Sequence, residues 1–456
     1  MDFENPKHLI AAGRKVRAEY MKAVHNISIS DHQKLICRDD PVKGPLWVSK
    51  FTLPSSSSAG DTSCESLLQL VDEANVHQVR YDHPASAPLD FEWVGYRANV
   101  KKDTPEPSIG EKEKFDRLSA ETKSPLTIFY IYGGTFVVNT PSCYRKTAVT
   151  LAQATGAKAL LVRQRLAPQN PFPAALLDVF QAYLALLHPP AGSPHEPIPA
   201  SSIVIAGDSS GACLALGLLQ ILLQLQRREA TVTFHGAKIS LSSSSPKVPA
   251  GMALVGPASD LTNSLPSCER NAYCDTLPLP NDKLPYLKKS YPTCPAWPTR
   301  PARANLYCEA GMLAHPLASP AASDDWTGTC PVWMALGQEQ IADSVRLVAQ
   351  EIHRAGGSVT LSEYECLFHS FYFVLRTAPQ TKHLFGEWAK AIGGFARGER
   401  PLSSARFIRA RGLKEEPLDV ENLVDFSVPQ AREWMWEKTH TYKVPAFHQE
   451  GRGPSL

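Results

Sequence analysis

The stretch "SSIVIAGDSSGAC" (residues 201–213) decides the fold. A short apolar run rich in isoleucine and valine ends in Gly207-x-Ser209-x-Gly211, and a long apolar helical pattern follows at once. Such a run is typical of a buried strand. A tight strand-to-helix turn crowds the positions two before and two after its central residue, so small residues are needed there. The elbow glycines Gly207 and Gly211 therefore predict that Ser209 lies on such a turn as a nucleophile.

Short apolar segments alternate with helical patterns from about residue 120 onward. Besides the stretch at 201–213, the segments are "PLTIFYIY" (125–132), "KALLVRQRL" (158–166), "GMALVGPASD" (251–260), "CPVWMALGQE" (330–339) and "SVTLSEYE" (358–365). Apolar strands that alternate with helices are typical of a parallel sheet buried on both faces. The sequence therefore predicts an α/β fold with a mostly parallel, twisted sheet and helices on both faces.

The chain length of 456 residues and the hydrophobic content of 43% favour one large domain with appended segments. We expect N-terminal cap helices in 1–50, early strands and loops in 51–119, the alternating core in 120–400 with a Pro-rich insertion at 277–303, and a partly disordered C-terminal extension in 401–456. The early strands are predicted at "VHQVRYD" (76–82) and "LDFEWVGYR" (89–97), and one more helix is expected within 417–440.

Charge and composition narrow the classes of partner. The 47 basic and 45 acidic residues leave a net charge of +2, which provides no broad field for nucleic acid or an anionic membrane. The start lacks the order of a signal peptide, and no run of eighteen apolar residues occurs, so we expect a cytoplasmic protein with no integral membrane span. The ten cysteines show neither CxxC pairs nor zinc-type spacing, and we expect no metal.

Residues 7–25 alternate apolar and basic side chains with helical period, which predicts a helix with a basic outer face. Two interpretations stay open from the residues alone. The helix can pack on the domain as part of a cap, or it can associate weakly with a membrane surface.

A nucleophilic serine needs a base, which on a sheet of this type follows later in the chain, after a later strand. His369 in "YECLFHSFYF" comes just after the segment 358–365. His315 is the other histidine worth naming, but its His-Pro context is typical of a turn. We therefore expect His369 to serve Ser209.

The base in turn needs an orienting acid, for which there are three candidates. Glu339 comes immediately after the strand segment "CPVWMALG" (330–337), in the turn before a helix. Asp343 is typical of a first-turn acid of that helix, and Asp260 of a turn or cap. We favour Glu339 and keep Asp343 and Asp260 as alternatives.

Several motifs occur together and in order across about residues 120–400. They are "YGGTF" (132–136), "RLAPQNPFPAALLD" (165–178), "GDSSG" (207–211), "GPASDLTNS" (256–264), "HPLASP" (315–320), and the acid and histidine loops. In these the chain resembles the hormone-sensitive-lipase-like branch of the α/β-hydrolase family. The resemblance implies an α/β-hydrolase fold with a helical cap, and a catalytic core at 120–400 that cleaves carboxylic esters without a metal or organic cofactor.

The resemblance also implies roles for residues. The family acid precedes a downstream Asp in an acid-x-apolar-x-Asp pattern, which Glu339-Gln-Ile-Ala-Asp343 fits, so Ser209, His369 and Glu339 are the implied triad. The main-chain N–H groups of Gly134, Thr135 and Ser210 are the implied oxyanion hole.

Four positions depart from the family pattern. Tyr132 replaces the family histidine, Thr135 the third glycine, Gln169 the acid after "RLAP", and Ser210 the alanine after the nucleophile. Main-chain donors survive a change of side chain, so the hole can persist. A positive φ would strain Thr135, because β-branched residues tolerate that region poorly.

The expected function is hydrolysis of a small or medium-sized carboxylic ester through an acyl-enzyme. The altered "IYGGTF" keeps one alternative open, a ligand-binding protein without turnover. The resemblance keeps another open, acyl transfer or dehydration on a natural product, because some relatives carry out such chemistry with a modified pocket. The length, the insertion and the tail "PLDVENLVDF" (417–426) resemble fungal members of the branch, some of which act on secondary metabolites. The substrate is therefore a small molecule, and a homodimer is left open.

Overall fold

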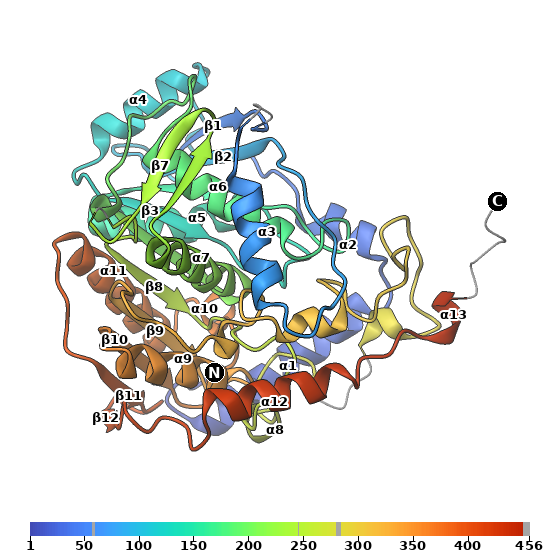
Figure 1. Cartoon of the computed structure of the whole chain (residues 1–456). Coiled ribbons are helices and arrows are strands. Elements are labelled where there is room, and N and C mark those ends of the chain that lie inside the picture. The colour runs from blue at the N-terminus through green and yellow to red at the C-terminus, as the bar shows by residue number, and fades with distance from the viewer. Residues whose placement is uncertain (57–59, 245, 280–283, 450–456) are drawn as a thin grey trace.

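The computed structural model describes residues 1–56, 60–244, 246–279 and 284–449. A ten-stranded sheet runs through the molecule in the order β1-β2-β4-β3-β5-β8-β9-β10-β11-β12 (Figure 1). Its strands are β1 (Leu46–Leu53), β2 (Leu89–Tyr96), β3 (Thr127–Ile131), β4 (Lys158–Val162), β5 (Ile203–Asp208), β8 (Gly251–Val255), β9 (Val332–Gly337), β10 (Val359–Tyr364), β11 (Ser404–Ile408) and β12 (Glu415–Leu418). The expected disorder of the last residues, 450–456, lies outside the described residues.

The sheet is mostly parallel, as predicted. The strands from β4 to β11 pair in parallel, whereas β1, β2 and β12 add antiparallel edges. Alternate residues of β3 belong to different cores: Ile128 and Tyr130 pack on one side, and Phe129 and Ile131 on the other. Because successive side chains of a strand point to opposite faces, an all-apolar strand is what a sheet covered on both sides requires.

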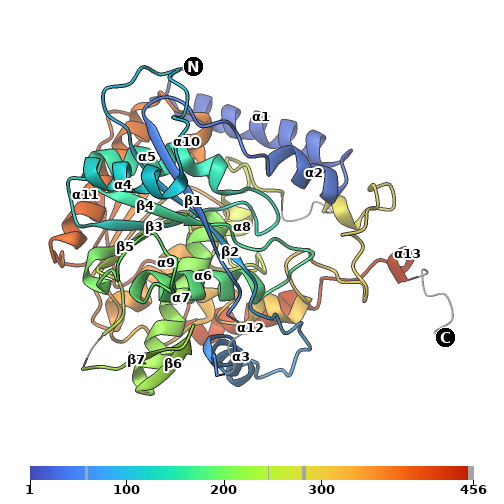
Figure 2. The same cartoon turned by 90° about the horizontal axis from the view of Figure 1, so that it is seen from above.

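Helices cover both faces of the sheet (Figure 2). One face carries α3 (Ser63–Ala74), α4 (Glu111–Glu121), α6 (Ala174–Leu187), α7 (Ser209–Arg227) and α9 (Ala342–Arg354); the other carries α1 (Pro6–Val24), α5 (Pro141–Thr155), α10 (Phe371–Val374) and α11 (Pro379–Ala396). The remaining helices are α2 (Ile29–Ile36), α8 (Ser267–Arg270), α12 (Val428–Thr439), α13 (Ala446–Gln449) and the 3-10 turns Ala200–Ser202, Pro285–Leu287, Ala310–Ala314 and Pro320–Ala322. The hairpin of β6 (Ala230–Phe234) and β7 (Ala237–Leu241) stands apart from the main sheet.

The predicted strand at 76–82 is wrong. Val76 is 77% exposed, and Val79 bonds back to the side chain of Asn75 instead of to a strand. The sheet edge is occupied instead by β1, which pairs with β2 over its whole length. The region 51–119 also contains the helices α3 and α4, where only strands and loops were expected.

The segments at the two ends of the chain pack on the same domain as the core strands. The predicted helix at 7–25 is present as α1, and Figure 2 shows it next to α2 along one side of the molecule. Beyond residue 400, β11 and β12 extend the main sheet, so the sheet does not end where the core was expected to end. The additional helix expected within 417–440 is α12.

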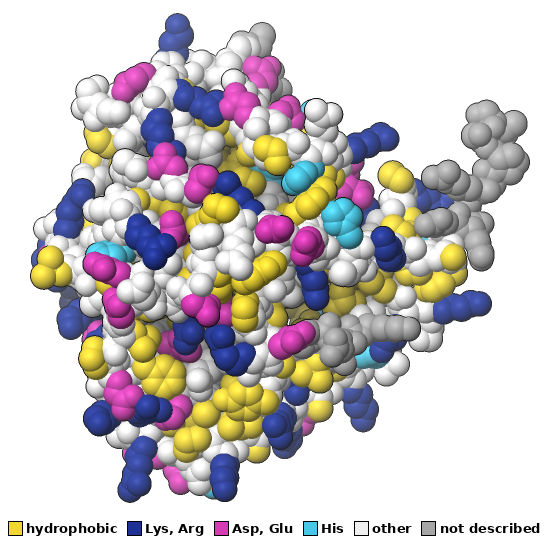
Figure 3. Space-filling model, turned by 60° about the horizontal axis from the view of Figure 1, so that its bottom comes forward, with side chains coloured by type: hydrophobic (Ala, Val, Ile, Leu, Met, Phe, Trp, Pro, Cys, Tyr) yellow, Lys and Arg dark blue, Asp and Glu magenta, His cyan; other side chains and the backbone are white. Residues whose placement is uncertain are grey.

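Within the described part of the chain, α7 is the one helix long and apolar enough to cross a membrane. The protein itself buries 83% of its apolar window, so α7 is the central core helix that carries Ser209. On the face that Figure 3 shows, basic and acidic side chains are interspersed rather than gathered by sign.

Candidate active site

Ser209 lies where β5 ends and α7 begins, with a φ of 50°. A Cβ atom on Gly207 would lie 2.6 Å from the carbonyl oxygen of Ile131, and one on Gly211 would lie 2.2 Å from the same oxygen. Both distances are too short for any side chain. The glycines therefore let the turn press against the end of β3, and the Gly-x-Ser-x-Gly spacing follows from this contact.

The structure brings Ser209, His369 and Glu339 together. The Nε2 atom of His369 lies 2.7 Å from Ser209 Oγ, and its Nδ1 atom lies 2.6 Å from Glu339 Oε2. The second oxygen of Glu339 accepts the main-chain N–H of Gly337 at 2.8 Å. Since a carboxylate only accepts, Nδ1 carries the proton and Nε2 is free to accept the hydroxyl proton of Ser209.

Burial and charge oppose each other at His369. Burial by itself would lower the pKa of the imidazole, but the charge of Glu339 and its hydrogen bond outweigh burial and raise the pKa above its ordinary value. Glu339 is 1% exposed, so its carboxylate acts on the ring with little screening by water. This pair therefore stabilises a protonated imidazole.

The alternative acids are engaged elsewhere. Asp343 accepts the N–H of Ser267 and pairs with Arg270, as a first-turn acid of α9. Asp260 accepts the N–H and the hydroxyl of Thr262, which closes a turn. Among the described residues, neither carboxylate contacts the imidazole, so neither replaces Glu339 in this arrangement.

His315 is also held away from Ser209. Its Nε2 atom lies 3.0 Å from the carbonyl oxygen of Val71, and its Nδ1 atom accepts the N–H of Leu317 at 3.1 Å. Burial lowers the pKa of His315 to about 4, so this ring stays neutral and structural.

The "IYGGTF" loop passes directly over Ser209. A Cβ atom on Gly133 would lie 2.8 Å from the Cβ atom of Ser209, and one on Gly134, whose φ is 140°, would lie 2.2 Å from Val138 O. Within the described chain, the N–H groups of Gly134 and Thr135 donate to no other group. These donors are therefore free beside the serine.

Thr135 has a φ of 54°, a region that β-branched residues rarely adopt. Its hydroxyl donates to the carbonyl of Gly134 at 2.7 Å, a local bond that offsets part of the strain. The third donor, the N–H of Ser210, belongs to the first turn of α7, where helical N–H groups lack partners within the helix. The hydroxyl of Ser210 accepts the N–H of Phe136 at 3.3 Å and ties the loop to the helix.

A buried carboxylate supports this loop from below, and sequence reasoning missed it. Asp208 accepts hydroxyls from Tyr130 at 2.9 Å and Tyr144 at 3.0 Å, and the N–H of Gly133 at 3.3 Å. Burial raises the pKa of Asp208 to about 6 against these opposing hydrogen bonds. The sequence could have indicated Asp208 only through its position in "GDSSG", directly before Ser209.

Tyr132, at the position where the resemblance leads us to expect a histidine, is fully buried. Its ring packs beside Tyr144 with centroids 5.5 Å apart, and its carbonyl accepts from Gln164 at 3.0 Å. Its hydroxyl has no partner among the described residues. The substitution therefore fills the apolar core instead of adding a group to the site.

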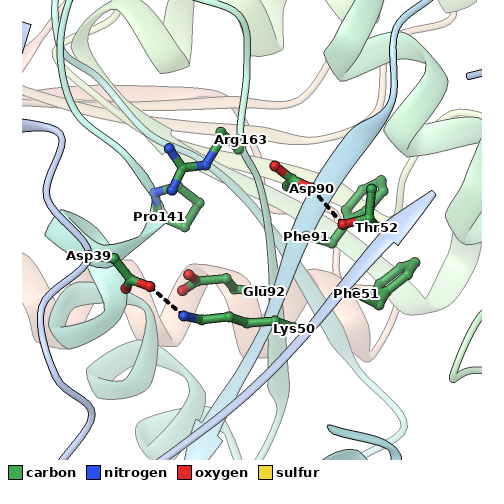
Figure 4. Close-up of a pocket in the computed structure, with 9 residues that line it drawn as sticks. All are labelled: Asp39, Lys50, Phe51, Thr52, Asp90, Phe91, Glu92, Pro141 and Arg163. Atoms are coloured by element: carbon green, nitrogen blue, oxygen red, sulfur yellow. Dashed lines mark hydrogen bonds and ion pairs between the residues drawn. The ribbon is translucent and has the colours of Figure 1, made fainter. Parts of the chain in front are cut away.

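A separate cavity of 210 Å³ lies between β1, β2 and the start of α5 (Figure 4). Its charged lining includes Asp39, Lys50 and Arg163, and Lys50 reaches across it to Asp39 at 2.5 Å. Ser209, His369 and Glu339 do not line this cavity, so it is not the candidate active site. In the parts of the chain that the structure describes, no group of three or more His, Cys, Asp or Glu side chains could hold a metal ion.

Comparison with known proteins places the chain in a family. Residues 128–373, more than half of the chain, match the family described as alpha/beta hydrolase fold. The chain belongs to this family.

Two relatives carry names of hydrolases. An acetyl-hydrolase of Streptomyces hygroscopicus is 30% identical over 274 residues, which cover 60% of this chain and 77% of the relative. An esterase of Acinetobacter venetianus is 25% identical over 276 residues, with the same coverage of 60% and 77%. A solved esterase from the bacterial hormone-sensitive lipase family aligns with a TM-score of 0.51 at 17% identity, over 86% of this chain and 98% of that one, and supports the fold.

Proposed function

We propose that the protein is a serine-dependent carboxylic-ester hydrolase in which Ser209, His369 and Glu339 form the catalytic triad. The observation that carries the proposal is the continuous chain of short contacts, 2.7 Å from Ser209 Oγ to Nε2 and 2.6 Å from Nδ1 to Glu339. The names of the two relatives agree with this activity.

The mechanism follows from these positions. Ser209 Oγ attacks the ester carbonyl while His369 Nε2 takes its proton, and Glu339 stabilises the imidazolium that forms. The imidazolium then protonates the leaving alcohol, and a water activated by the same ring hydrolyses the acyl-enzyme. Every proton moves through one imidazole, and the chemistry needs no metal or organic cofactor.

The oxyanion of the tetrahedral intermediate is held by the N–H groups of Gly134, Thr135 and Ser210. The N–H groups of Gly134 and Thr135 are free beside the serine. The N–H of Ser210 lies in the first turn of α7, at the positive end of the helix dipole. Loss of one such donor typically costs about 10²- to 10³-fold in rate. The Thr135 replacement is compatible with this role, because the donor is a main-chain group.

The proposed substrate is a small or medium-sized ester, with a secondary metabolite of the kind that fungal members of the branch process as a specific case. We further propose that residues 1–50 and the insertion 277–303 cap the site. The N-terminal part contacts the loops at the serine: Gln33 of α2 donates to the carbonyl of Val137 at 2.8 Å.

Hydrolysis of p-nitrophenyl acetate and p-nitrophenyl butyrate tests the proposal. The wild-type protein is expected to hydrolyse at least one of them with an initial burst of p-nitrophenol, and Ser209→Ala is expected to lose about 10⁴-fold or more in kcat. Asp343→Asn is the matched control for the acid and should retain a far larger share of turnover than Glu339→Gln. Tight binding of esters by wild type without turnover would favour the ligand-binding alternative, and product transferred to an added alcohol would favour acyl transfer.

A further inference from the structure

Residues 271–276, between α8 and the Pro-rich insertion, run past the two loops that carry the candidate base and acid. The amide of Asn271 donates to the carbonyl oxygen of Glu339 at 2.8 Å. The hydroxyl of Thr276 donates to the carbonyl oxygen of His369 at 3.2 Å. One short segment therefore touches both loops through their main chains.

Asp275 lies in this segment and is completely buried. Its Oδ1 atom accepts the main-chain N–H of His369 at 2.8 Å and that of Thr276 at 2.7 Å, while Oδ2 accepts the N–H of Gln340 at 2.7 Å. Within the described residues no cation pairs with this carboxylate. Both oxygens face N–H donors, which matches the acceptor-only ionised form.

The carboxylate thus joins the main chain of His369 to the residue that follows Glu339. Hydrogen bonds to an ionised acceptor are shorter and stronger than neutral ones, and burial prevents water from replacing them. The two loops leave different strands, β10 and β9. Gln338 links them near the strand ends, because its side-chain oxygen accepts the N–H of Cys366 at 2.8 Å and its own N–H donates to the carbonyl oxygen of Tyr364 at 3.1 Å. Asp275 adds a link closer to the 2.6 Å contact of His369 with Glu339, because its partners are His369 itself and the residue after Glu339.

We propose that Asp275 is a positioning residue of the triad, which fixes the loop of His369 against the loop of Glu339 by accepting a main-chain N–H from each. The inference rests on the proposed function. It assigns to Asp275 no contact with substrate, because the carboxylate acts through the two residues that it positions.

The charge of Asp275 also acts on the imidazole. The titratable groups whose charge interacts with that of Asp275 are His369, Glu339, Cys274 and Cys268, and Arg17 contacts its main-chain carbonyl. The carboxylates whose charge acts on the imidazole are Glu339, Asp275 and Asp208. Burial lowers the pKa of His369, Glu339 raises it, and Asp275 raises it further. A neutral residue at 275 would therefore lower the pKa of His369 and would also hold the two loops together less firmly.

The N-terminal helix supports the segment from the other side. Arg17 of α1 donates to the carbonyl oxygens of Ala272 at 2.6 Å and of Asp275 at 3.2 Å, and Arg14 donates to that of Tyr273 at 2.9 Å. Two basic side chains of α1 therefore bind the protein instead of forming part of a purely outward basic face. They extend the support of the triad to the first helix of the chain.

The test compares Asp275→Asn with wild type in the pH dependence of kcat/KM on p-nitrophenyl butyrate, per active site titrated with a fluorophosphonate. An asparagine keeps one acceptor but turns an NH₂ group toward one of the two loops. We expect kcat/KM to fall by about 10²-fold. We also expect the acid limb of the pH profile, where kcat/KM rises with pH, to move to lower pH. Removal of a negative charge lowers the pKa of the imidazole, which must be neutral to act as a base.

The matched control is Asp260→Asn, since Asp260 is also buried and accepts main-chain N–H groups but does not face His369. It should leave the acid limb unchanged. If Asp275→Asn keeps the wild-type limb and the wild-type turnover per active site, the inference is overturned. Absence of turnover in wild type would instead count against the proposed function, so the two failures are distinguishable.

A second variant keeps the inference testable if Asp275→Asn does not fold. Arg17→Ala removes the support from α1, and Lys15→Ala on the same helix, whose side chain is 78% exposed, is its control. We expect Arg17→Ala to lower kcat several-fold with little change in KM, and Lys15→Ala to match wild type. Equal kcat values for the two variants would overturn the inference.

Discussion

Gly134 is the residue on which the conformation of the proposed oxyanion loop depends most. At its φ of 140°, a side chain would strain the backbone and would meet Val138 O at 2.2 Å. Thr135 differs, because it already has a side chain at φ 54° and contributes its main-chain N–H. Of the three glycines that the resemblance leads us to expect, this chain has Gly133 and Gly134, where a side chain would clash, and it has a threonine at the third position.

A Gly134→Ala variant should therefore lose about 10²- to 10³-fold in kcat, since the backbone must move and displace at least one donor. Thr135→Gly should stay within a few-fold of wild type in the same p-nitrophenyl ester assay. Gly386→Ala is the control: Gly386 is exposed in α11 with nothing within 4 Å of an added Cβ, so activity should be unaffected. Full activity in Gly134→Ala would exclude this loop as the hole, and a marked gain in Thr135→Gly would show that the threonine restrains it.

The residues at the site differ in how far the sequence could predict them. Ser209, Glu339 and His369 were predictable as candidates because each follows a strand directly, at the edge where parallel strands present their carboxyl ends. Asp275 was not, because it lies in a segment without regular period. Its partners are main-chain N–H groups, which leave no trace in a sequence. Asp208 is next to Ser209 in the sequence, but only the folded structure shows that Tyr130 and Tyr144 donate to it.

At the scale of elements, the core strands from 125 to 365 were predictable because they are apolar on both faces. The edge was not. Residues 76–82 alternate like a strand yet pair with no strand in the described part of the chain. Strand β1 carries Ser49 and Lys50 and is a strand because β2 lies beside it. Pairing at an edge depends on tertiary context more than on local pattern.

Helix α2 is hydrogen-bonded to the chain that follows the proposed oxyanion loop. Gln33 donates to Val137 O at 2.8 Å, and its amide exchanges hydrogen bonds with that of Gln169 at 2.7 and 3.2 Å. Gln169 is the position where the resemblance leads us to expect an acid. A neutral amide there can both donate to and accept from another glutamine, which a carboxylate cannot do.

Replacing Gln33 by Ala should therefore loosen the loop beneath α2. Loss of such a hydrogen bond costs about 1 kcal/mol, or about fivefold in a local opening equilibrium. Amide hydrogen exchange by mass spectrometry should show faster exchange for residues 133–139. Lys34→Ala is the matched control, because Lys34 is 80% exposed and only pairs with Asp31 at 3.6 Å. Unchanged exchange in Gln33→Ala, or an equal change in both variants, would contradict this role of α2.

At the scale of the whole molecule, one ten-stranded sheet assembles the site from segments far apart in the chain. The loop after β3, the turn into α7, and the loops after β9 and β10 converge at Ser209. The N-terminal helices reach the same place through main-chain carbonyls of the site loops. Arg17 of α1 and Gln33 of α2 therefore link the N-terminal helices to the segments around the candidate site, and substitution of either residue should affect the proposed catalysis.

The most direct measurement of the central claim is the mass of the intact protein after reaction with a fluorophosphonate, followed by mapping of the modified peptide. The expected result is a single adduct on Ser209 in wild type, none in Ser209→Ala, and strongly slowed labelling when His369 is replaced by Ala, because the serine loses its base. An adduct on another residue, or no adduct on folded wild-type protein, would contradict the assignment of Ser209 as an activated nucleophile.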